Sequence, residues 1–212
     1  MLYFLDLLGT FAFAITGAYK AKGANLNIFG VVLLGVITSV GGGTFRDLLI
    51  GRVPLFYLRD ANYLLVGILA GVIVYSMPVL FKRAYSFFRL ADSLGLAAFI
   101  TIGTSISFTF LFATEANPTL LSFLVTVLLG MITGGGGGII RDAIMRDVPL
   151  SLKHGSNYIL SAFWGASSFY FLMFVNLKFA AIFSIIIVLV FREIISNFGI
   201  YKKIIIKDSV RK

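Results

Sequence analysis

Two arginine–aspartate pairs, each following a run of glycines within an apolar stretch, are the residues best placed to do chemistry. Arg46-Asp47 follows Gly41–Gly43, and Arg141-Asp142 follows Gly134–Gly138. Ionisable groups in apolar spans are costly and usually face a bundle interior or a transport pathway. Carboxylates, carbonyls and hydroxyls can replace the water around a passing cation. The expected pore and gate residues are Thr38, Ser39, Gly41, Gly42, Gly43, Arg46, Asp47, Thr133, Gly134, Gly135, Gly136, Gly137, Gly138, Arg141 and Asp142.

The charged pairs allow two interpretations. In the first, the carboxylates set the local potential of a wet cation path, the arginines hold them in place, and the three hydroxyls replace ion hydration. In the second, the charges form salt bridges, Arg46 with Asp142 and Arg141 with Asp47, that fix two halves of the chain together. The two arginines cancel the two aspartates, so charge alone does not predict cation selectivity.

The glycine runs are expected to break their helices. Glycine is about 1 kcal/mol worse than alanine in a helix interior, and Gly41–Gly43 and Gly134–Gly138 place several in a row. In lipid, the freed backbone groups must be buried in protein or line a wet cavity. The breaks would then act as a gate that bends or straightens. The alternative is close helix packing through small residues. The transport interpretation depends on both runs being unwound and hydrated.

The composition excludes most other classes of protein. Of 212 residues, 59% are hydrophobic and 13% charged, with a mean hydropathy of +0.99. Soluble domains are about 25% charged, so a soluble enzyme is excluded and no catalytic residues are expected. Without cysteine, and with one histidine, the chain is expected to hold no cofactor and no metal beyond transient potassium.

The apolar stretches predict an all-α, polytopic membrane protein, since about 20 apolar residues cross a bilayer as a helix. We expect residues 1–212 to form a single transmembrane domain with seven spans and a basic cytoplasmic tail at 199–212. The expected spans are 3–19, 27–50, 60–80, 91–113, 119–145, 156–175 and 178–198.

Basic residues set the orientation. Fourteen of the 18 lysines and arginines fall on the side of the C-terminus and four on the other side. By the positive-inside rule, the chain lies in the cell membrane as a multi-pass protein with its N-terminus outside and its C-terminus in the cytoplasm. The net charge of +9 is therefore explained by topology, and no nucleic acid partner is expected. The basic tail could also contact anionic membrane lipids.

The chain contains a duplication. Residues 32–63 match residues 127–158 at an offset of 95, with 16 of 32 positions identical. Upstream the offset is 86, where Asp6 matches Asp92. Each copy (3–80 and 91–175) holds three spans, so the second copy enters the membrane from the opposite face and 178–198 is an extra helix. Such inverted repeats are typical of transport folds.

Other matched residues have simpler expected roles. Asp6 and Asp92 are expected at the N-termini of the first and fourth helices, where a carboxylate is favourable. Asn62-Tyr63 and Asn157-Tyr158 are expected to cap or anchor the third and sixth helices.

The doubled Gly-Gly-Gly-x-x-Arg-Asp motif, each copy followed by Val-Pro, resembles the prokaryotic trimeric intracellular cation (TRIC) channels over about residues 5–198. The resemblance implies a homotrimer with one pore per protomer, conducting monovalent cations, mainly potassium. It also implies that helices 27–50 and 119–145 line the pore, with kinks at Gly41–Gly43 and Gly136–Gly138.

The same family is also similar to proteins described as small amino-acid (glycine) transporters. Inverted repeats with broken helices suit a carrier as well as a channel. A secondary transporter for glycine or another small amino acid therefore stays open as the alternative. A channel needs a continuous wet path when open, whereas a carrier needs an occluded site.

Overall fold

The chain folds into a helical bundle. The computed structural model describes residues 2–77, 85–114, 117–153 and 157–194, and within these ranges it contains helices, turns and no strand. The expected tail at 199–212 and the far ends of the expected helices 60–80 and 178–198 lie outside the described residues. The all-helical prediction is confirmed for the part of the chain that is described.

Each expected span contains one long helix. These helices are α1 (Leu2–Gly23), α2 (Ile28–Leu49), α4 (Asn62–Ser76), α5 (Tyr85–Thr114), α6 (Leu120–Ile144), α7 (Tyr158–Met173) and α8 (Leu177–Leu189). Three short elements complete the described part: α3 (Phe56–Arg59), the 3-10 turn η2 (Leu150–Leu152) and the π-helical turn η3 (Val190–Ile194).

Two of these helices differ from expectation. α5 begins at Tyr85 rather than at residue 91, so Asp92 lies inside the helix and the prediction that it sits at a helix N-terminus is wrong. α8 passes into η3 at Val190 instead of continuing as an α-helix.

Polar residues start the helices that carry the motifs. The Asn27 side chain accepts a hydrogen bond from the amide of Gly30 at 2.9 Å and caps α2. Thr119 and Ser122 form a reciprocal capping box at the start of α6. Such caps satisfy amide groups that have no partner within the helix. They fix where α2 and α6 begin, and with that the register of the motifs near their ends.

α2 and α6 also end alike. The residue that follows each helix end, Gly51 after α2 and Arg146 after α6, is left-handed, with φ of 67° and 56°. The next amide then returns to the carbonyl of Asp47 at 2.8 Å and to that of Asp142 at 2.9 Å. The matched sequences thus produce matched helix ends.

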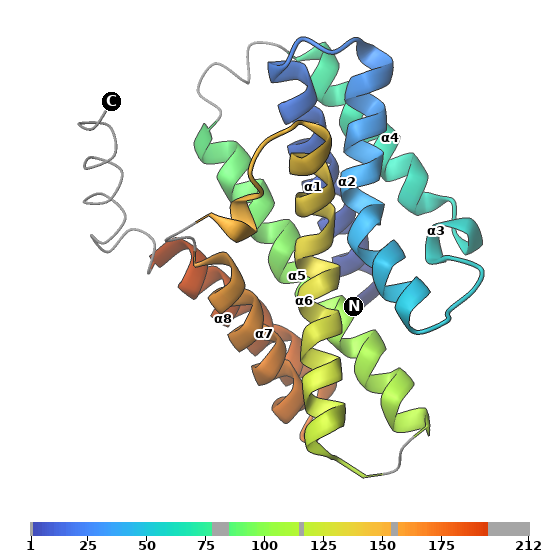
Figure 1. Cartoon of the computed structure of the whole chain (residues 1–212), viewed down its shortest axis with the longest axis vertical. Coiled ribbons are helices and arrows are strands. Elements are labelled where there is room, and N and C mark those ends of the chain that lie inside the picture. The colour runs from blue at the N-terminus through green and yellow to red at the C-terminus, as the bar shows by residue number, and fades with distance from the viewer. Residues whose placement is uncertain (1, 78–84, 115–116, 154–156, 195–212) are drawn as a thin grey trace.

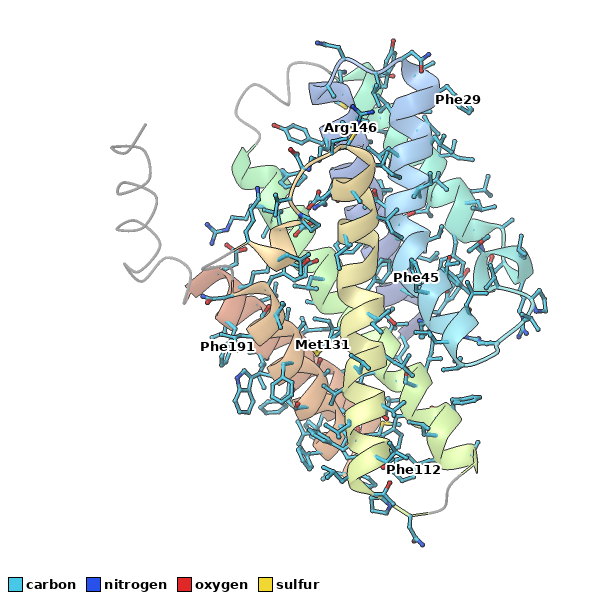
Figure 2. The ribbon with its side chains drawn as sticks, viewed as in Figure 1. Phe29, Phe45, Phe112, Met131, Arg146 and Phe191 are labelled. Carbon is cyan, nitrogen blue, oxygen red and sulfur yellow. The ribbon has the colours of Figure 1, made fainter. Side chains whose placement is uncertain are left out.

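Four helices form the centre of the bundle. α1 packs against α2 and α5, while α6 packs against α5 and α2. α4 covers α1 and α2, while on the other side α7 covers α5 and α6 and α8 packs against α5 and α7 (Figure 1). Figure 2 places Phe29, at the start of α2, near the same end of the molecule as Arg146, just past α6, and Phe112 at the opposite end. α2 and α6 therefore run in opposite directions.

Reciprocal aromatic packing joins α1 to α5. The Phe13 and Phe99 rings meet edge to face, with centroids 5.1 Å apart. A Cβ on Gly95 would fall against the Phe13 ring, and a Cβ on Gly9 would lie 2.9 Å from the Phe99 ring. Each glycine thus makes room for the phenylalanine of the other copy, which brings the two helices together.

The outer surface is apolar. Four helices are long and apolar enough to cross a membrane, namely α1, α2, the segment Phe88–Ala113 of α5, and α6. α4 and α7 are shorter apolar helices of 15 and 16 residues. Phe29 and Phe45 of α2 are exposed, as Figure 2 shows for these labelled side chains. Large apolar side chains exposed on helices of this length are typical of a protein that faces lipid.

Candidate functional site at the crossing of α2 and α6

α2 and α6 cross at their glycine runs with almost no space between the backbones. A Cβ on Gly42 would fall on the carbonyl oxygen of Thr133, and a Cβ on Gly137 would fall on that of Thr38. A Cβ on Gly136 would lie 3.1 Å from the Cα of Gly42. Only glycine allows this approach, and the contact is the same when read from either copy.

The prediction that the glycine runs break their helices is wrong. Gly41–Gly43 lie inside α2 and Gly134–Gly138 inside α6, and both helices are continuous and buried there. The low helix propensity of glycine reflects competition with a hydrated, flexible chain. In an apolar setting the intrahelical hydrogen bonds are hard to replace, and the missing side chains allow close packing instead. Unwound, hydrated backbone therefore cannot be the basis for transport in this arrangement.

The three candidate hydroxyls lie next to this crossing and are buried. Thr38 donates to the carbonyl of Leu34 at 2.6 Å, and Thr133 donates to that of Leu129 at 2.7 Å. Ser39 bonds its own helix in the same way, at 2.9 Å. The hydroxyl protons are therefore committed to the backbone, while the oxygen lone pairs stay available as acceptors.

One cluster of charges lies where α2 ends; we call it the first-repeat cluster (Asp6, Arg46, Asp47, Arg52 and Tyr63). Arg46 donates from Nε and Nη2 to Oδ1 of Asp47, at 2.9 and 2.8 Å. Arg52 lies 3.7 Å from the same oxygen, and the amide of Phe56 donates to Oδ2. The Tyr63 hydroxyl donates to Asp6 at 2.8 Å. Arg46 and Asp47 are buried.

A second, larger cluster lies where α6 ends; we call it the second-repeat cluster (Lys20, Asp92, Arg141, Asp142, Tyr158 and Arg192). Arg141 donates to Asp142 and to Asp92, each at 2.8 Å, and also to the hydroxyl of Thr16. Lys20 donates to Asp142 at 2.8 Å, and Arg192 pairs with Asp92. Asp92, Arg141 and Asp142 are almost fully buried.

Lys20 extends the second-repeat cluster toward the surface. It also pairs with exposed Asp147, just beyond α6, at 2.6 Å. The hydrogen bond from Lys20 holds the pKa of Asp147 below its usual value. The amide of Leu150 donates to the second oxygen of Asp142 at 3.0 Å, as the amide of Phe56 does for Asp47.

The expected salt bridges between the repeats do not form. Arg46 pairs with its neighbour Asp47 and Arg141 with its neighbour Asp142, so the predicted pairs Arg46–Asp142 and Arg141–Asp47 are wrong. The antiparallel crossing explains this, because residues past the glycines of α2 lie on the opposite side of the crossing from those past the glycines of α6. Each arginine instead pairs with the aspartate that follows it, and the Arg141–Asp142 pair is joined by Lys20 from the first copy and by Asp92 from its own copy.

Several members of the clusters had no expected role there. Lys20 and Arg192 reach the second-repeat cluster from helices outside the motif, and nothing in their local sequence indicates this. Asp92 and Tyr158 could have been found, since their matches Asp6 and Tyr63 stand at the same places in the first copy. A polar residue kept at the same position in both copies of a membrane repeat is a useful signal.

The first-repeat cluster holds two positive and two negative charges, whereas the second-repeat cluster holds three positive and two negative charges, with the carboxylate of Asp147 beside it. Removing one partner of a buried ion pair costs about 3–5 kcal/mol, because the other charge is left without compensation. Among the described residues, no group of three or more histidine, cysteine, aspartate or glutamate residues is arranged to hold a metal ion.

Comparisons with known proteins point to one family. The family model described as "Glycine transporter" matches residues 3–78 and 89–174. The UPF0126 inner membrane protein YadS of Escherichia coli (strain K12) is 37% identical, over 72% of this chain and 70% of that protein. A UPF0126 membrane protein of Deinococcus radiodurans is 37% identical, over 81% and 76%. A third, from Vibrio cholerae, is 36% identical, and the match spans 61% of that protein's length.

Solved structures of similar fold carry a functional description. The TRIC trimeric intracellular cation channel orthologue from Rhodobacter sphaeroides superimposes with a TM-score of 0.79 at 28% identity, over 88% of this chain and 92% of that chain. A prokaryotic TRIC channel crystallised in 0.5 M KCl gives a TM-score of 0.79 at 30% identity, over 94% and 98%. The shared fold thus extends over nearly the whole of both chains.

Proposed function

The chain belongs to the glycine transporter family, the family of the TRIC channels, and from that premise we propose that it is a passive, potassium-permeable cation channel. The observation that carries the proposal is the likeness to TRIC channel structures over nearly the whole chain. The proposed activity moves ions and breaks no covalent bond, so the protein is not an enzyme.

The proposed ion path runs along α2 and α6, one path in each protomer. The glycines of the two helices touch at their crossing, which supports a path that is closed at this point. We therefore place the gate at Gly41–Gly43 and Gly134–Gly138, as first expected, but with a different motion. Because Gly42, Gly136 and Gly137 meet the facing helix mainly through backbone atoms, the helices open the path by moving apart or sliding, without unwinding.

The charged and hydroxylic residues flank this gate. Asp47 and Asp142 set the local potential on either side of the crossing, and Arg46 and Arg141 hold them in place. Carbonyl groups and the oxygens of Thr38, Ser39 and Thr133 face the cation as the helices separate. Their bonds to the helix backbone support this role, because they leave the oxygen lone pairs available for coordination.

We propose seven membrane spans in an inverted repeat, with the first copy at 3–80, the second at 91–175, an extra helix at 178–198 and a basic tail at 199–212. The one-to-one contacts of matched residues support this organisation. The bias of basic residues supports an outside N-terminus and a cytoplasmic C-terminus. The second-repeat cluster then lies toward the cytoplasm.

We propose a homotrimer in the cell membrane. A hollow of 230 Å³ beside the crossing has an almost wholly apolar lining, which includes Val40, Phe45, Leu48 and Ile140. A wall with so few polar groups does not suit a cation path. Lipid or a neighbouring protomer is the natural cover for such a surface, and TRIC neighbours are described as trimeric.

A carrier for glycine or another small amino acid is the second candidate. The description of the family supports it, and so does the closed crossing with a charged cluster on either side, because alternating access requires that the path can be closed. The charges of both signs at each cluster match those of a zwitterion.

Reconstitution separates the two functions. Purified protein in liposomes with a potassium gradient is assayed for potassium flux with a potential-sensitive dye, and parallel vesicles are assayed for labelled glycine uptake. Potassium flux that stays linear with concentration supports the channel. Saturable glycine uptake without potassium flux supports the carrier and rejects the channel.

A further inference from the structure

The space left by the last glycine of the α2 run is filled by an aromatic ring. A Cβ on Gly43 would lie 2.7 Å from the ring of Phe56. Phe56 is the first residue of the short helix α3, which follows α2 in the chain and packs back against α2 and α4 (Figure 1). Gly42 meets the backbone of α6, whereas Gly43 makes room for a side chain from the segment between α2 and α4. The first glycine run therefore serves two contacts, the crossing and a seat for this ring.

Contacts with the first-repeat cluster hold the ring in place. The ring of Phe56 meets that of Tyr63 edge to face, with centroids 4.7 Å apart. The guanidinium of Arg46 lies 5.8 Å from the centroid of the Phe56 ring, and the amide of Phe56 donates to Oδ2 of Asp47 at 3.3 Å. Edge-to-face ring pairs and cations over ring faces both stabilise such an arrangement. The ring thus lies directly against the charges at the end of α2.

The second copy has no aromatic residue at the matching position. Ser151 stands where Phe56 stands in the first copy, at the same offset of 95 as the glycine runs. A Cβ on the matching glycine, Gly138, would meet the Tyr158 hydroxyl at 3.5 Å and Arg141 at 3.6 Å, both at ordinary contact distance. The duplication therefore supplies a comparison within one chain, in which one helix end is covered by a ring and the other is lined by polar groups.

Two exposed hydrogen bonds tie down the segment that carries the ring. Nη2 of Arg59 donates to the carbonyl of Val53 at 2.7 Å, which closes the segment on itself. The hydroxyl of Tyr3, from the start of α1, donates to Asp60 at 2.6 Å. Exposed hydrogen bonds compete with water, so each contributes little to stability, and segments held in this way open more easily than the core. α3 can therefore lift from α2 without disturbing the buried helices.

We propose that Phe56 is an aromatic lid over the mouth at the end of α2, and that it closes this mouth separately from the glycine crossing. With the lid down, the ring covers Gly43 and the Arg46–Asp47 pair, and an apolar constriction excludes hydrated ions by dewetting. When α3 lifts, the ring leaves its seat and water reaches the charged pair. The two mouths of the path are then unequal, because the second copy has Ser151 at this position. In the proposed orientation the lid lies at the outer face.

Ion flux tests the lid, which rests on the proposed channel function. Phe56→Ser gives the first copy the residue that the second copy has. Because the path conducts only when lid and crossing are both open, potassium flux into liposomes should rise about two- to tenfold, the change in equilibrium that one aromatic pair makes. The control Leu58→Ser makes a similar change at an exposed side chain of α3 and should leave flux unchanged. Unchanged flux in Phe56→Ser, or an equal rise in Leu58→Ser, would overturn the lid.

Thiol labelling tests the lid without ion flux, because the chain contains no cysteine. Thr10 of α1 is fully buried, and its hydroxyl donates to its own helix, so Thr10→Cys is a mild change. Asp6 lies one turn nearer the mouth. Phe13, on the other side, reaches the crossing, where its ring lies 3.4 Å from a Cβ on Gly137. In spheroplasts, a charged methanethiosulfonate added outside should label Thr10→Cys slowly, and about two- to tenfold faster after Phe56→Ser.

A thiol on α8 is the control for a general loosening of the bundle. Ser184 is fully buried and bonds Thr101 at 3.1 Å, and Ser184→Cys should be labelled no faster in the Phe56→Ser background. Equal labelling of Thr10→Cys with and without the ring, or a parallel rise at Ser184→Cys, would reject the lid. If wild type shows no potassium flux, the channel proposal fails, and the labelling rates alone decide the lid.

Discussion

The close crossing of α2 and α6 makes a sharp prediction about two neighbouring glycines of α6. A Cβ at Gly137 would fall on the carbonyl oxygen of Thr38 in α2, whereas a Cβ at Gly135 would meet only the Tyr158 ring, at an ordinary 3.6 Å. Gly135→Ala and Gly137→Ala are therefore a matched pair. They make the same chemical change in the same helix, and only one of them meets backbone.

The magnitudes follow from packing and helix propensity. Alanine in place of glycine stabilises a helix interior by about 0.5–1 kcal/mol, which Gly135→Ala should gain. At Gly137 the same gain is outweighed by overpacking of about 1–3 kcal/mol. The helices must separate by about 1 Å to restore van der Waals contact, which forfeits a quarter to a half of the attraction between the atoms that move apart. We expect Gly137→Ala to be less stable than Gly135→Ala by about 2 kcal/mol.

Thermal unfolding of the purified protein in detergent measures this difference. For a chain of this size, 1 kcal/mol shifts the melting temperature by about 2–4 °C. Gly135→Ala should melt slightly above wild type and Gly137→Ala several degrees below it. A Gly137→Ala protein that melts at or above Gly135→Ala would contradict the tight crossing and the gate placed there.

Three further predictions concern the charges. Asp142→Asn leaves the buried guanidinium of Arg141 with less compensation and should destabilise the fold by about 3–5 kcal/mol. The effect should appear as loss of folded protein on size-exclusion chromatography. A near-normal yield and melting temperature would contradict this prediction. Lys20→Met removes a partly exposed partner and should cost only about 1 kcal/mol or less by thermal melting, so a loss equal to that of Asp142→Asn would show that Lys20 is misplaced. The hydrogen bond from Tyr3 lowers the pKa of exposed Asp60 below its ordinary value of 3.8. The stabilisation of the fold by this bond is therefore complete above pH 3.8 and is lost as the pH falls through the lowered pKa. Tyr3→Phe should reduce this acid sensitivity of the melting temperature, and identical acid profiles would refute the contact.

Much of the architecture follows from local sequence. Apolar stretches of about 20 residues give the positions of the helices, and polar residues such as Asn27 and Thr119 mark where α2 and α6 begin. Corresponding positions of the two copies also behave alike, as the two left-handed residues after α2 and α6 do. These features depend on short-range chemistry, which a single chain displays directly.

The glycine runs show where such reasoning stops. Propensities come from peptides in water, where glycine gains freedom when a helix unwinds. Inside an apolar bundle the unwound backbone would lose hydrogen bonds that nothing replaces. The choice between breaking and close packing therefore depends on whether another helix lies alongside, and the sequence of α2 alone does not show that α6 fills this place.

The pairing of the charged side chains could not be predicted from the sequence either. The sequence predicts that Arg141 is buried and needs a carboxylate, but it does not say which one. The antiparallel crossing brings Asp92 from α5 and Lys20 from α1, and it separates Arg141 from Asp47. Such choices follow from how helices cross, which is a property of the assembled bundle.

The central claim is that this protein conducts cations through a path that opens where α2 meets α6. Single-channel recording of purified protein in a planar bilayer, with unequal potassium chloride on the two sides, tests it most directly. The account predicts discrete current steps that reverse near the potassium equilibrium potential. A bilayer that stays silent with protein that takes up glycine saturably in vesicles would contradict it.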